Sequence, residues 1–456
     1  MQQGSSAAAE LTPDGRKKIL AQSQTFARQA YRVLALAMRE VERGVDELEA
    51  DTLEQGLTFL GLVAMMDPPH REVPDAIQKC RKAGIRVVMI TGDHPMTAQA
   101  IASKIGLAPE TPVAQPGRFV PVIEGAQVDT FSDEQLRRLL TPTAPGEPDP
   151  IFARMAPRHK MRIVSVLKEM REVVAVTGDG VNDAPALKMA DIGIAMGAAG
   201  TDVAKETASM ILLDDNFATI VSAIEEGRAV FLNIRKFMTY VLASNVPEVV
   251  PYLAYGLSSL PLALTVPQIL AVDLGTDMVP ALALAAERPH SGVMDEPPRP
   301  RTERLLNRDV LIRAYAFLGL IEAGIAMGGF FLYLHSEGWT WGDPLDWNSP
   351  LYKEATTVTF AGIVAAQVAN VFACRSDRFP AFQLGWVSNP LLLLGVAVEL
   401  TLLFIMTYSP LGHLILGTAS IPAWIYGPLV LGAIGLLLAD GFKKSLSGRM
   451  RTRQAG

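Results

Sequence analysis

Residues Thr177 to Pro185 read TGDGVNDAP and follow the apolar run VVAV at 173–176. A short apolar run before a glycine-rich turn is typical of a buried parallel strand, and open α/β sheets bind ligands where such strands end. The turn carries two carboxylates four residues apart, Asp179 and Asp183, which suit Mg²⁺ beside a phosphoryl group. Its two glycines let the backbone approach a phosphate closely. We therefore interpret this turn as a phosphate and Mg²⁺ site rather than an acidic surface loop.

The composition divides the chain into a soluble part and a membrane part. Of 456 residues, 49% are hydrophobic and 19% are charged, which is too apolar for an ordinary soluble protein of this length. Charges are dense up to about residue 230, and stretches of about 20 apolar residues, long enough to cross a bilayer, follow. The net charge of −6 and the lack of a basic, aromatic-rich stripe argue against a nucleic-acid partner. Cys80 and Cys374 lie too far apart in sequence to indicate a metal site, and we expect no disulfide.

Six membrane spans are expected, forming an all-α transmembrane domain. They cover 233–257, 262–286, 311–335, 355–374, 389–408 and 421–440. Lys and Arg flank the first span and fill alternate connections and the tail, whereas the connections 258–261 and 409–420 have none. Because positive residues stay on the cytoplasmic side, we expect an integral protein of the cell membrane with its soluble part and C-terminus in the cytoplasm. Membrane lipid is then a partner.

The soluble part is expected to be α/β, with a doubly wound parallel sheet. GIRVVMITGD at 84–93 predicts a strand that ends in a Gly-Asp turn, and a third strand begins at Ile151. Helical patterns supply the crossovers: 74–83, 94–105 and 158–170. The stretch 108–150, with repeated prolines, is expected to be an irregular excursion.

Three further residues are candidates for the same crevice. Thr91 and Asp93, in TGDHP, would add a hydroxyl and a carboxylate, although a Thr at a strand end most often caps the next helix. Lys160, in ARMAPRHK, begins a helix after the third strand and would neutralise a phosphoryl oxygen. A lone lysine at a helix start is usually a solvated surface residue. These roles are supported only because the TGDGVNDAP turn occurs in the same sequence.

Three acidic residues lie inside the first two expected spans: Glu248, Asp273 and Asp277. No Lys or Arg lies between Phe237 and Ala286 to pair with them, and each costs about 2.5–3.5 kcal/mol at mid-membrane. Prolines in both spans and a glycine in the second disturb the helices, so that backbone carbonyls can serve as ligands. With Asn245 and Thr276, the acids form an oxygen-rich site suited to Na⁺, K⁺, Ca²⁺ or H⁺.

An alternative interpretation stays open for these acids, namely that they are protonated or paired to polar neighbours and serve packing. It is as strong as the functional one for Glu322 in the third span and Glu399 in the fifth.

Several motifs, in order and spacing, resemble those of one family. They are DPPH at 67–70, TGDHPMTA at 91–98, FARMAPRHK at 152–160, TGDGVNDAP at 177–185, SNVPE at 244–248 and DLGTDMVPA at 273–281. From about residue 25 onward the chain resembles the C-terminal half of a P-type cation-transporting ATPase of the second group, which holds Ca²⁺, Na⁺/K⁺ and H⁺/K⁺ pumps. The resemblance implies a haloacid-dehalogenase-like soluble domain, ATP and Mg²⁺ as cofactors, and ATP hydrolysis coupled to the transport of a monovalent or divalent cation.

The resemblance also implies roles for single residues of the soluble part. Asp179 and Asp183 would hold or flank the catalytic Mg²⁺, Lys160 would contact the phosphoryl group, and Asn182 would support the pocket. The phosphorylation pocket would be shaped by Thr91, Gly92 and Asp93. Nucleotide-side positions would be Arg32 in YRVLALA, Asp67 and Arg154. His70 stands where the family's DPPR has arginine, which puts that one contact in doubt.

In the membrane part, the positions that match cation ligands are Asn245, Glu248, Asp273, Thr276 and Asp277, with Gln367 and Asn370 as weaker additions. Asp273 followed by LGTDMVP resembles the Na⁺/K⁺ and H⁺/K⁺ pumps. Ser244 stands where proton pumps of that branch carry a lysine, which weighs against H⁺/K⁺ transport. The resemblance leaves Ca²⁺ and Na⁺ nearly equal.

Two family motifs do not occur in the sequence: the DKTGT segment, whose aspartate is the nucleophile, and the TGE loop. The family's first four membrane helices, one of which supplies cation ligands, are also unmatched. We expect a remnant of the nucleotide-binding domain (1–50), a haloacid-dehalogenase-like domain without its nucleophile segment (51–230), a transmembrane domain (231–441) and a basic cytoplasmic tail (442–456). Without a nucleophile, the polypeptide alone is not expected to pump. It would be a gene fragment, or a split-pump half that needs an N-terminal half.

Two other functions stay open. A membrane-tethered haloacid-dehalogenase-like phosphatase would also need a nucleophilic aspartate, and residues 1–66 offer no apolar strand followed by an Asp-x-Asp or Asp-x-Thr turn. A non-catalytic remnant would bind cations without ATP-dependent chemistry.

Overall fold

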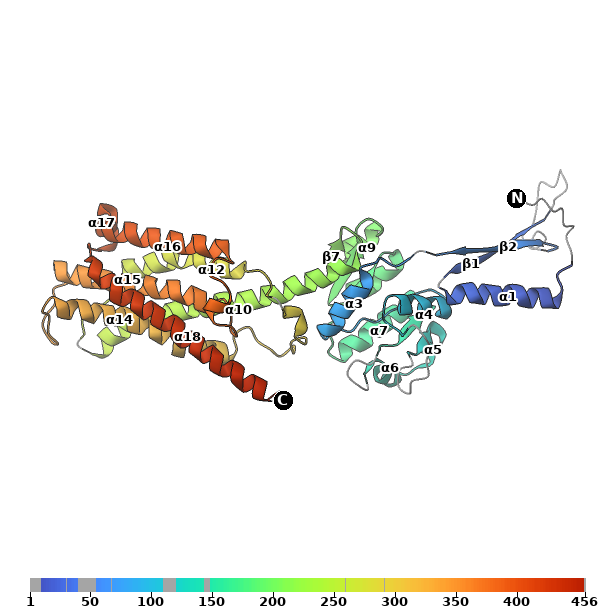
Figure 1. Ribbon diagram of the computed structural model, residues 1–456, viewed down its shortest axis with the longest axis horizontal. Helices are drawn as coiled ribbons and strands as arrows, with labels where there is room; N and C mark the ends of the chain where they lie inside the picture. Colours follow the sequence, from blue (N-terminus) through green and yellow to red (C-terminus); the bar gives the residue numbers. More distant parts are fainter. Residues whose placement is uncertain are drawn as a thin grey trace. The chain divides into compact units, whose positions relative to one another are not determined.

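The computed structural model describes residues 10–29, 31–39, 55–66, 68–109, 120–142, 148–258, 260–290 and 292–454. The chain forms two compact units, whose elements are labelled in Figure 1. Unit 1 comprises residues 1–224 and 294–298, and unit 2 comprises 225–293 and 299–456.

Unit 1 is α/β, but its strands form three small sheets. β3 (Val122–Glu124) and β4 (Ile151–Ala153) pair in parallel. β5 (Ala175–Gly178), β6 (Ile192–Met196) and β7 (Met210–Leu212) form a second parallel sheet in that order. β1 (Arg32–Met38) and β2 (Thr58–Met65) form an antiparallel pair. The prediction of one doubly wound sheet is therefore wrong for the described residues, although the parallel pairing around the TGDGVNDAP turn is as expected.

The predicted strand over 84–93 accounts for part of this difference. It forms a single bridge, between Ile90 and Phe152, supported by a hydrogen bond from Thr91 N–H to the Phe152 carbonyl (2.9 Å). Its apolar side chains pack into two cores, Val87 and Met89 into one and Val88 and Ile90 into the other. The segment therefore runs beside β4 with its apolar side chains half-buried, and it does not extend the ladder.

The helices of unit 1 follow the sequence pattern more closely. α3 (Val73–Lys82), α4 (Pro95–Lys104) and α7 (Pro157–Glu169) confirm the three predicted helices within one residue at each end. The prediction that 108–150 is irregular is wrong where β3, α5 (Gly125–Thr130) and α6 (Asp133–Leu140) lie. α6 begins with a capping box, in which Ser132 and Gln135 each bond the other's backbone N–H (3.2 and 2.8 Å).

Unit 2 is helical. Among the described residues, five segments are long and apolar enough to cross a membrane: Val266–Ala285, Arg308–Ser336, Pro350–Cys374, Pro390–Tyr408 and Ala423–Leu446. They contain α11 (Val266–Ala271), α12 (Met278–Ala285), α14 (Gly319–Ser336), α15 (Pro350–Cys374), α16 (Pro390–Tyr408) and most of α18 (Tyr426–Gln454). The expected first span, 233–257, is the end of α10 (Phe217–Leu257) and is not one of the five. Asn245, Glu248 and the two prolines of α10 lower its mean hydropathy, so the six-span prediction is not confirmed.

α15 is the central helix of unit 2. It contacts α14, α16 and α18 (Figure 1), and 89% of its most apolar stretch is buried inside the protein. Gly362 allows this packing because a β-carbon there would lie 3.0 Å from the Ala326 backbone of α14. Such small residues let membrane helices approach closely.

Arg375, at the C-terminus of α15, forms a buried ion pair with Glu287. Its side chain is 3% exposed, and its Nε and Nη2 donate to Glu287 Oε1 (2.8 and 2.6 Å). We expect Arg375→Ala to destabilise the chain by about 3–5 kcal/mol, because a buried carboxylate loses its main partner. Thermal unfolding in detergent measures this. Arg138→Ala, which removes an exposed pair with Glu134, serves as the control, and an equally small loss for both variants would contradict the expectation.

Candidate functional site

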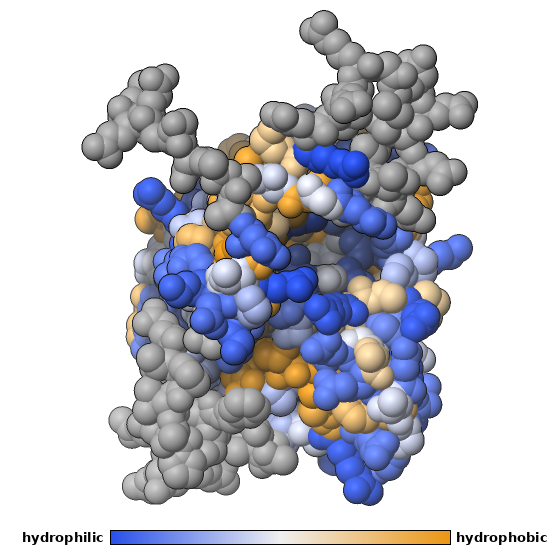
Figure 2. Space-filling model, turned by 90° about the vertical axis from the view of Figure 1, so that its right-hand side faces the viewer, coloured by the Kyte–Doolittle hydropathy of each residue, from blue (hydrophilic) through white to orange (hydrophobic). Residues whose placement is uncertain are grey.

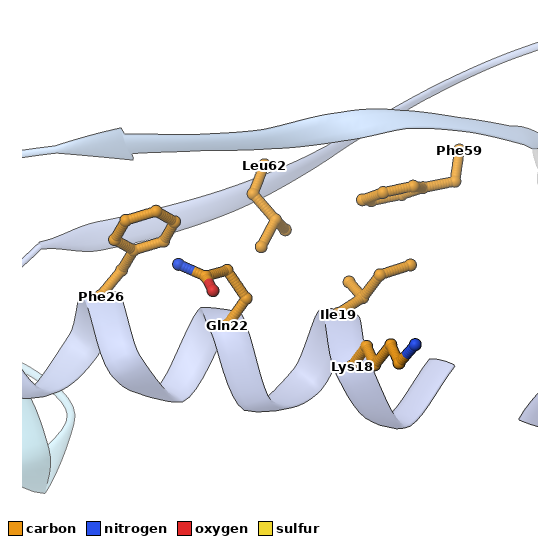
Figure 3. A pocket seen from close by; sticks show the side chains of 6 residues that line it. All are labelled: Lys18, Ile19, Gln22, Phe26, Phe59 and Leu62. Carbon is orange, nitrogen blue, oxygen red and sulfur yellow. The ribbon is translucent and has the colours of Figure 1, made fainter. Parts of the chain in front are cut away.

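A shallow groove between α1 (Pro13–Arg28) and β2 is not the candidate site. Figure 3 shows Ile19 and Phe26 of α1 facing Phe59 and Leu62 of β2, with Lys18 and Gln22 as the polar lining residues. Several apolar residues of the β1–β2 pair are also exposed, among them Leu34, Leu36 and Leu60. Figure 2 shows hydrophobic patches between hydrophilic residues. This lining carries none of the carboxylates or motif residues that phosphate chemistry requires.

The TGDGVNDAP turn instead brings a carboxylate and a lysine together. β5 ends at Gly178, a short 3₁₀ turn covers Val181–Asp183, and α8 (Ala184–Met189) follows. Asp183 is 7% exposed, and its Oδ1 lies 2.5 Å from Lys160 Nζ of α7. Its Oδ2 accepts the Gly180 N–H (3.4 Å). An anion and a cation from two helices thus meet beside the carboxyl end of a parallel strand.

The remaining residues of the turn suit a metal ion that also binds solvent or substrate. Asp179 and Asn182 are exposed, and the Asp179 carbonyl accepts the Thr201 N–H (2.8 Å). Within the described ranges, no group of three or more His, Cys, Asp or Glu residues is arranged to hold a metal. Mg²⁺ commonly takes only one or two protein carboxylates and completes its shell with water and phosphate oxygens. The pair Asp179 and Asp183 fits that requirement.

The TGD turn at 91–93 is tied to the connection that leads from β4 to Lys160. Thr91 Oγ1 donates to Asp93 Oδ2 (3.0 Å), and the Asp93 carbonyl accepts the Arg154 N–H (2.9 Å). The Thr91 carbonyl accepts the Met155 N–H (3.0 Å). A β-carbon on Gly92 would lie 3.9 Å from the Met155 carbonyl oxygen, an ordinary contact. Backbone hydrogen bonds therefore hold the TGD turn against the connection that precedes α7.

The predicted nucleotide-side residues are dispersed. Arg154 has a left-handed backbone (φ 51°), and its side chain pairs with Glu124 at 3.4 Å. Arg32 lies on β1, opposite Met65. Asp67 lies outside the described residues. The structure thus joins Lys160 to Asp183 and Thr91 to Asp93, but it places Arg32 on a separate sheet.

In unit 2, the second cluster lies where a helix departs from regular α-helical geometry. Val272–Thr276 is π-helical between α11 and α12. Directly after it, Asp277 is 6% exposed and accepts hydrogen bonds from Tyr240 Oη (2.7 Å) and Ser244 Oγ (3.4 Å) of α10. Thr276 Oγ1 lies 3.3 Å from Gln367 Oε1 of α15. Residues of three segments far apart in sequence therefore meet at this point.

The other predicted cation ligands differ in burial. Glu248 is 7% exposed, and Asn370 is fully buried. Asn245 is half-buried, whereas Asp273 is exposed on the surface of unit 2.

Several buried side-chain polar atoms of unit 2 have no hydrogen-bond partner among the residues that the structure describes. They include Glu248 Oε1, both carboxylate oxygens of Glu322 and Glu399, Gln367 Nε2 and Asn370 Nδ2. Buried polar groups without partners are rare, and each points to a missing water, proton or ion. Glu322 and Glu399 are both fully buried, so they lie inside the helix bundle.

Three family models match the chain. Residues 1–72 match "P-type ATPase, cytoplasmic domain N", 161–224 match "haloacid dehalogenase-like hydrolase", and 261–446 match "Cation transporting ATPase, C-terminus". The sodium/potassium-transporting ATPase subunit alpha-2 of Bos taurus is 41% identical over 409 residues, covering 80% of this chain and 39% of the relative. The chain belongs to the P-type cation-transporting ATPases.

Other P-type relatives agree with this assignment. The sodium/potassium-transporting ATPase subunit alpha-3 of Homo sapiens is 40% identical over 78% of this chain and 38% of its own length. The potassium-transporting ATPase alpha chain 1 of Xenopus laevis is 39% identical over 83% of this chain and 40% of its own length. The chain spans about two fifths of the length of these relatives. The predicted family is confirmed, and the haloacid-dehalogenase-like match contains Asp179 and Asp183.

Sequence reasoning missed one residue that fixes the backbone after β6 and one that contacts the acidic cluster of unit 2 in this P-type chain. Asp215 has a left-handed backbone (φ 51°) and accepts the N–H groups of Ala198 and Ala199 (3.0 and 2.7 Å). Chiefly the Ala199 hydrogen bond holds the pKa of its carboxyl below the usual value. Tyr240, which donates to Asp277, lies four residues before Ser244 and thus on the same helix face. That spacing is the signal that could have identified it.

Gly178 leaves room for Asp183. A β-carbon at Gly178 would lie 2.4 Å from Asp183 Cβ, whereas one at Gly180 would meet nothing closer than 3.8 Å. We expect Gly178→Ala to displace Asp183, to break its contact with Lys160 and to destabilise unit 1 by about 1–3 kcal/mol, as overpacking does. Thermal unfolding and Mg²⁺ titration of the two glycine variants measure this. If Gly180→Ala lost as much stability and Mg²⁺ affinity as Gly178→Ala, the steric explanation would be wrong.

Proposed function

We propose that the chain provides the Mg²⁺ and phosphate end of the catalytic site and part of the cation path of an ATP-driven pump. The observation that carries the proposal is the contact of Lys160 with Asp183 at 2.5 Å, beside the end of a strand. The other unit of the same chain buries the carboxylate of Asp277. Phosphoryl transfer depends mainly on positioning and charge stabilisation. A lysine and two carboxylates on rigid helix and turn backbones supply both.

In this proposal, each residue of the catalytic site has one task. Asp179 and Asp183 hold Mg²⁺, which neutralises charge on the phosphoryl oxygens when it is bound. The Lys160 ammonium faces the transferred group as a point charge. The exposed Asn182 amide and the Thr91–Asp93 turn line the pocket. ATP approaches past Arg32, Asp67 and Arg154. The aspartate that accepts the phosphoryl group belongs to a polypeptide segment outside these 456 residues.

The membrane site binds the cation through Asp277, Glu248, Thr276 and Gln367, with Asn245, Asp273 and Asn370 completing it. Support comes from the π-helical segment that directly precedes Asp277, because π-helical turns inside α-helices occur frequently at functional sites. The exposed Asp273 fits a site that a further membrane helix covers. Na⁺ and Ca²⁺ are the candidate ions, and the names of the relatives favour Na⁺. The end of α10 is a sixth span, and the soluble part and the C-terminus face the cytoplasm.

ATP-driven accumulation of ²²Na⁺ or ⁴⁵Ca²⁺ in vesicles tests this proposal. The chain is expressed alone and together with an N-terminal polypeptide carrying TGE and DKTGT segments. We expect uptake of one of the two ions only with both polypeptides. Absence of uptake in every combination, while both polypeptides insert in the membrane, would favour a protein that binds cations without turnover.

A further inference from the structure

His159, next to Lys160 in the first turn of α7, is buried and uses both ring nitrogens. Its side chain is 6% exposed. Nδ1 lies 3.1 Å from the backbone nitrogen of Ala156, and Nε2 lies 3.0 Å from Asp129 Oδ1 of α5. The proposed chemistry gives this residue no role.

These two partners decide the tautomer. The Ala156 N–H can only donate, so Nδ1 accepts and carries no proton, whereas the Asp129 carboxylate only accepts, so Nε2 carries the proton. Arg158 Nε also lies 3.3 Å from Nε2, but a nitrogen that donates to a carboxylate cannot accept there. Arg158 Nη2 instead donates to Asp129 Oδ2 (2.8 Å). Chiefly this bond holds the pKa of the Asp129 carboxyl below its usual value, so the carboxylate remains an acceptor.

Backbone packing prevents the ring from shifting. A β-carbon at Gly125, the first residue of α5, would lie 2.6 Å from the His159 ring and 2.6 Å from the Arg154 carbonyl oxygen. The imidazole therefore rests directly on the α5 backbone, and only glycine fits between them.

The bond to Nδ1 anchors the start of α7. Ala156 is the N-cap and has no side-chain acceptor, although N-caps normally supply one. His159 instead bonds back to the N-cap N–H, as Glu or Gln does in a capping box. The next residue is Lys160, whose Nζ reaches Asp183 at 2.5 Å.

We infer that His159 is a positioning residue for Lys160. Asp129 fixes the neutral Nε2–H tautomer, and Nδ1 then caps α7 and holds the lysine toward Asp183. The inference deepens the proposed function, since it concerns how the same site keeps its cation in place.

Lysine labelling of the full chain in detergent tests the inference without ATP or a phosphoryl acceptor, so its outcome is independent of whether the chain takes part in pumping. An amine-reactive acetylating reagent is applied at one fixed pH, and labelling of single lysines is read by mass spectrometry. For His159→Ala we expect Lys160 to label about fivefold faster, the change that loss of a helix-capping bond typically brings. Labelling of Lys168, in the same helix and bonded to the Met189 carbonyl, should stay unchanged. His159→Gln, which keeps a side-chain acceptor for the Ala156 N–H, should restore the slow rate.

Nitrogen NMR of the histidines gives a second readout that does not depend on a destabilising variant. The chain has 6 histidines, and the signal absent from His159→Gln identifies residue 159. We expect the Nε2–H form in the wild type and a mixture of tautomers in Asp129→Asn. An Nδ1–H tautomer in the wild type would overturn the inference. So would unchanged Lys160 labelling in His159→Ala, equal acceleration of Lys160 and Lys168, or no rescue by glutamine.

Discussion

Asp183→Ala is expected to lower phosphoenzyme formation by at least about a hundredfold, the usual cost of removing a preorganised charge from a transition state. The assay combines this chain with a polypeptide that supplies the DKTGT segment, and it measures acid-stable label from ATP. Asp183 is buried and paired with Lys160 at 2.5 Å, so its loss would remove a proposed Mg²⁺ ligand and leave the lysine without its anion. Lys160→Met should cause a loss of the same order, because both residues are proposed to act on one phosphoryl group.

The control for this pair is Lys188→Met. Lys188 is exposed on α8, directly after the same turn, and its loss should leave labelling within about twofold, as for a surface substitution. If Asp183→Ala and Lys188→Met behaved alike, the TGDGVNDAP turn would have no part in phosphoryl transfer.

Asp277→Asn is expected to weaken cation binding by at least about a hundredfold. Loss of a residue that only supports a metal ligand costs about 10–100-fold in metal affinity, and Asp277 is proposed to contact the cation itself. The measurement is equilibrium binding of ²²Na⁺ and ⁴⁵Ca²⁺ to the purified chain. Asp277 is a buried carboxylate directly after the π-helical segment, and two hydroxyl groups of α10 donate to it. Tyr240→Phe removes one of these hydroxyls and should cost about tenfold, since it only orients the ligand.

The chain offers a matched control for this prediction. Tyr333 Oη donates to Glu354 (2.8 Å), a second tyrosine–acid pair in unit 2. Glu354→Gln should leave cation affinity unchanged. Equal losses for Glu354→Gln and Asp277→Asn would indicate a general effect of charge and would remove Asp277 from the cation site.

The sequence predicted the helices of unit 1 better than its sheet. Helix starts are local signals, and the Pro residues that begin α4 and α7 lie where capping rules place them. A strand becomes part of a sheet only through partners distant in sequence. The apolar segment 84–93 was therefore predicted to be a strand, but its failure to extend a ladder beyond the Ile90 bridge could not be predicted.

The candidate sites show the same division. The spacing of Asp179 and Asp183 placed both carboxylates on one turn, and Gly275 and Pro280 indicated a disturbed helix that the structure resolves as π-helical. The sequence did not predict which face of that helix points into the bundle. Packing against neighbouring helices determines this face, so Asp277 is buried while Asp273 is exposed. The partners of His159 on α5 lie 30 or more residues away in sequence and gave no sequence signal.

Acid-stable phosphorylation from labelled ATP tests the central claim most directly. Membranes hold this chain alone, or with an N-terminal polypeptide carrying DKTGT, and Ca²⁺, Na⁺ and K⁺ are varied separately. We expect label only when both polypeptides are present, on the added one, and only with Na⁺ or only with Ca²⁺. Label on this chain alone would contradict the claim that the phosphoryl acceptor lies outside it. No label in any combination would contradict the claim that Lys160 and Asp183 serve phosphoryl transfer.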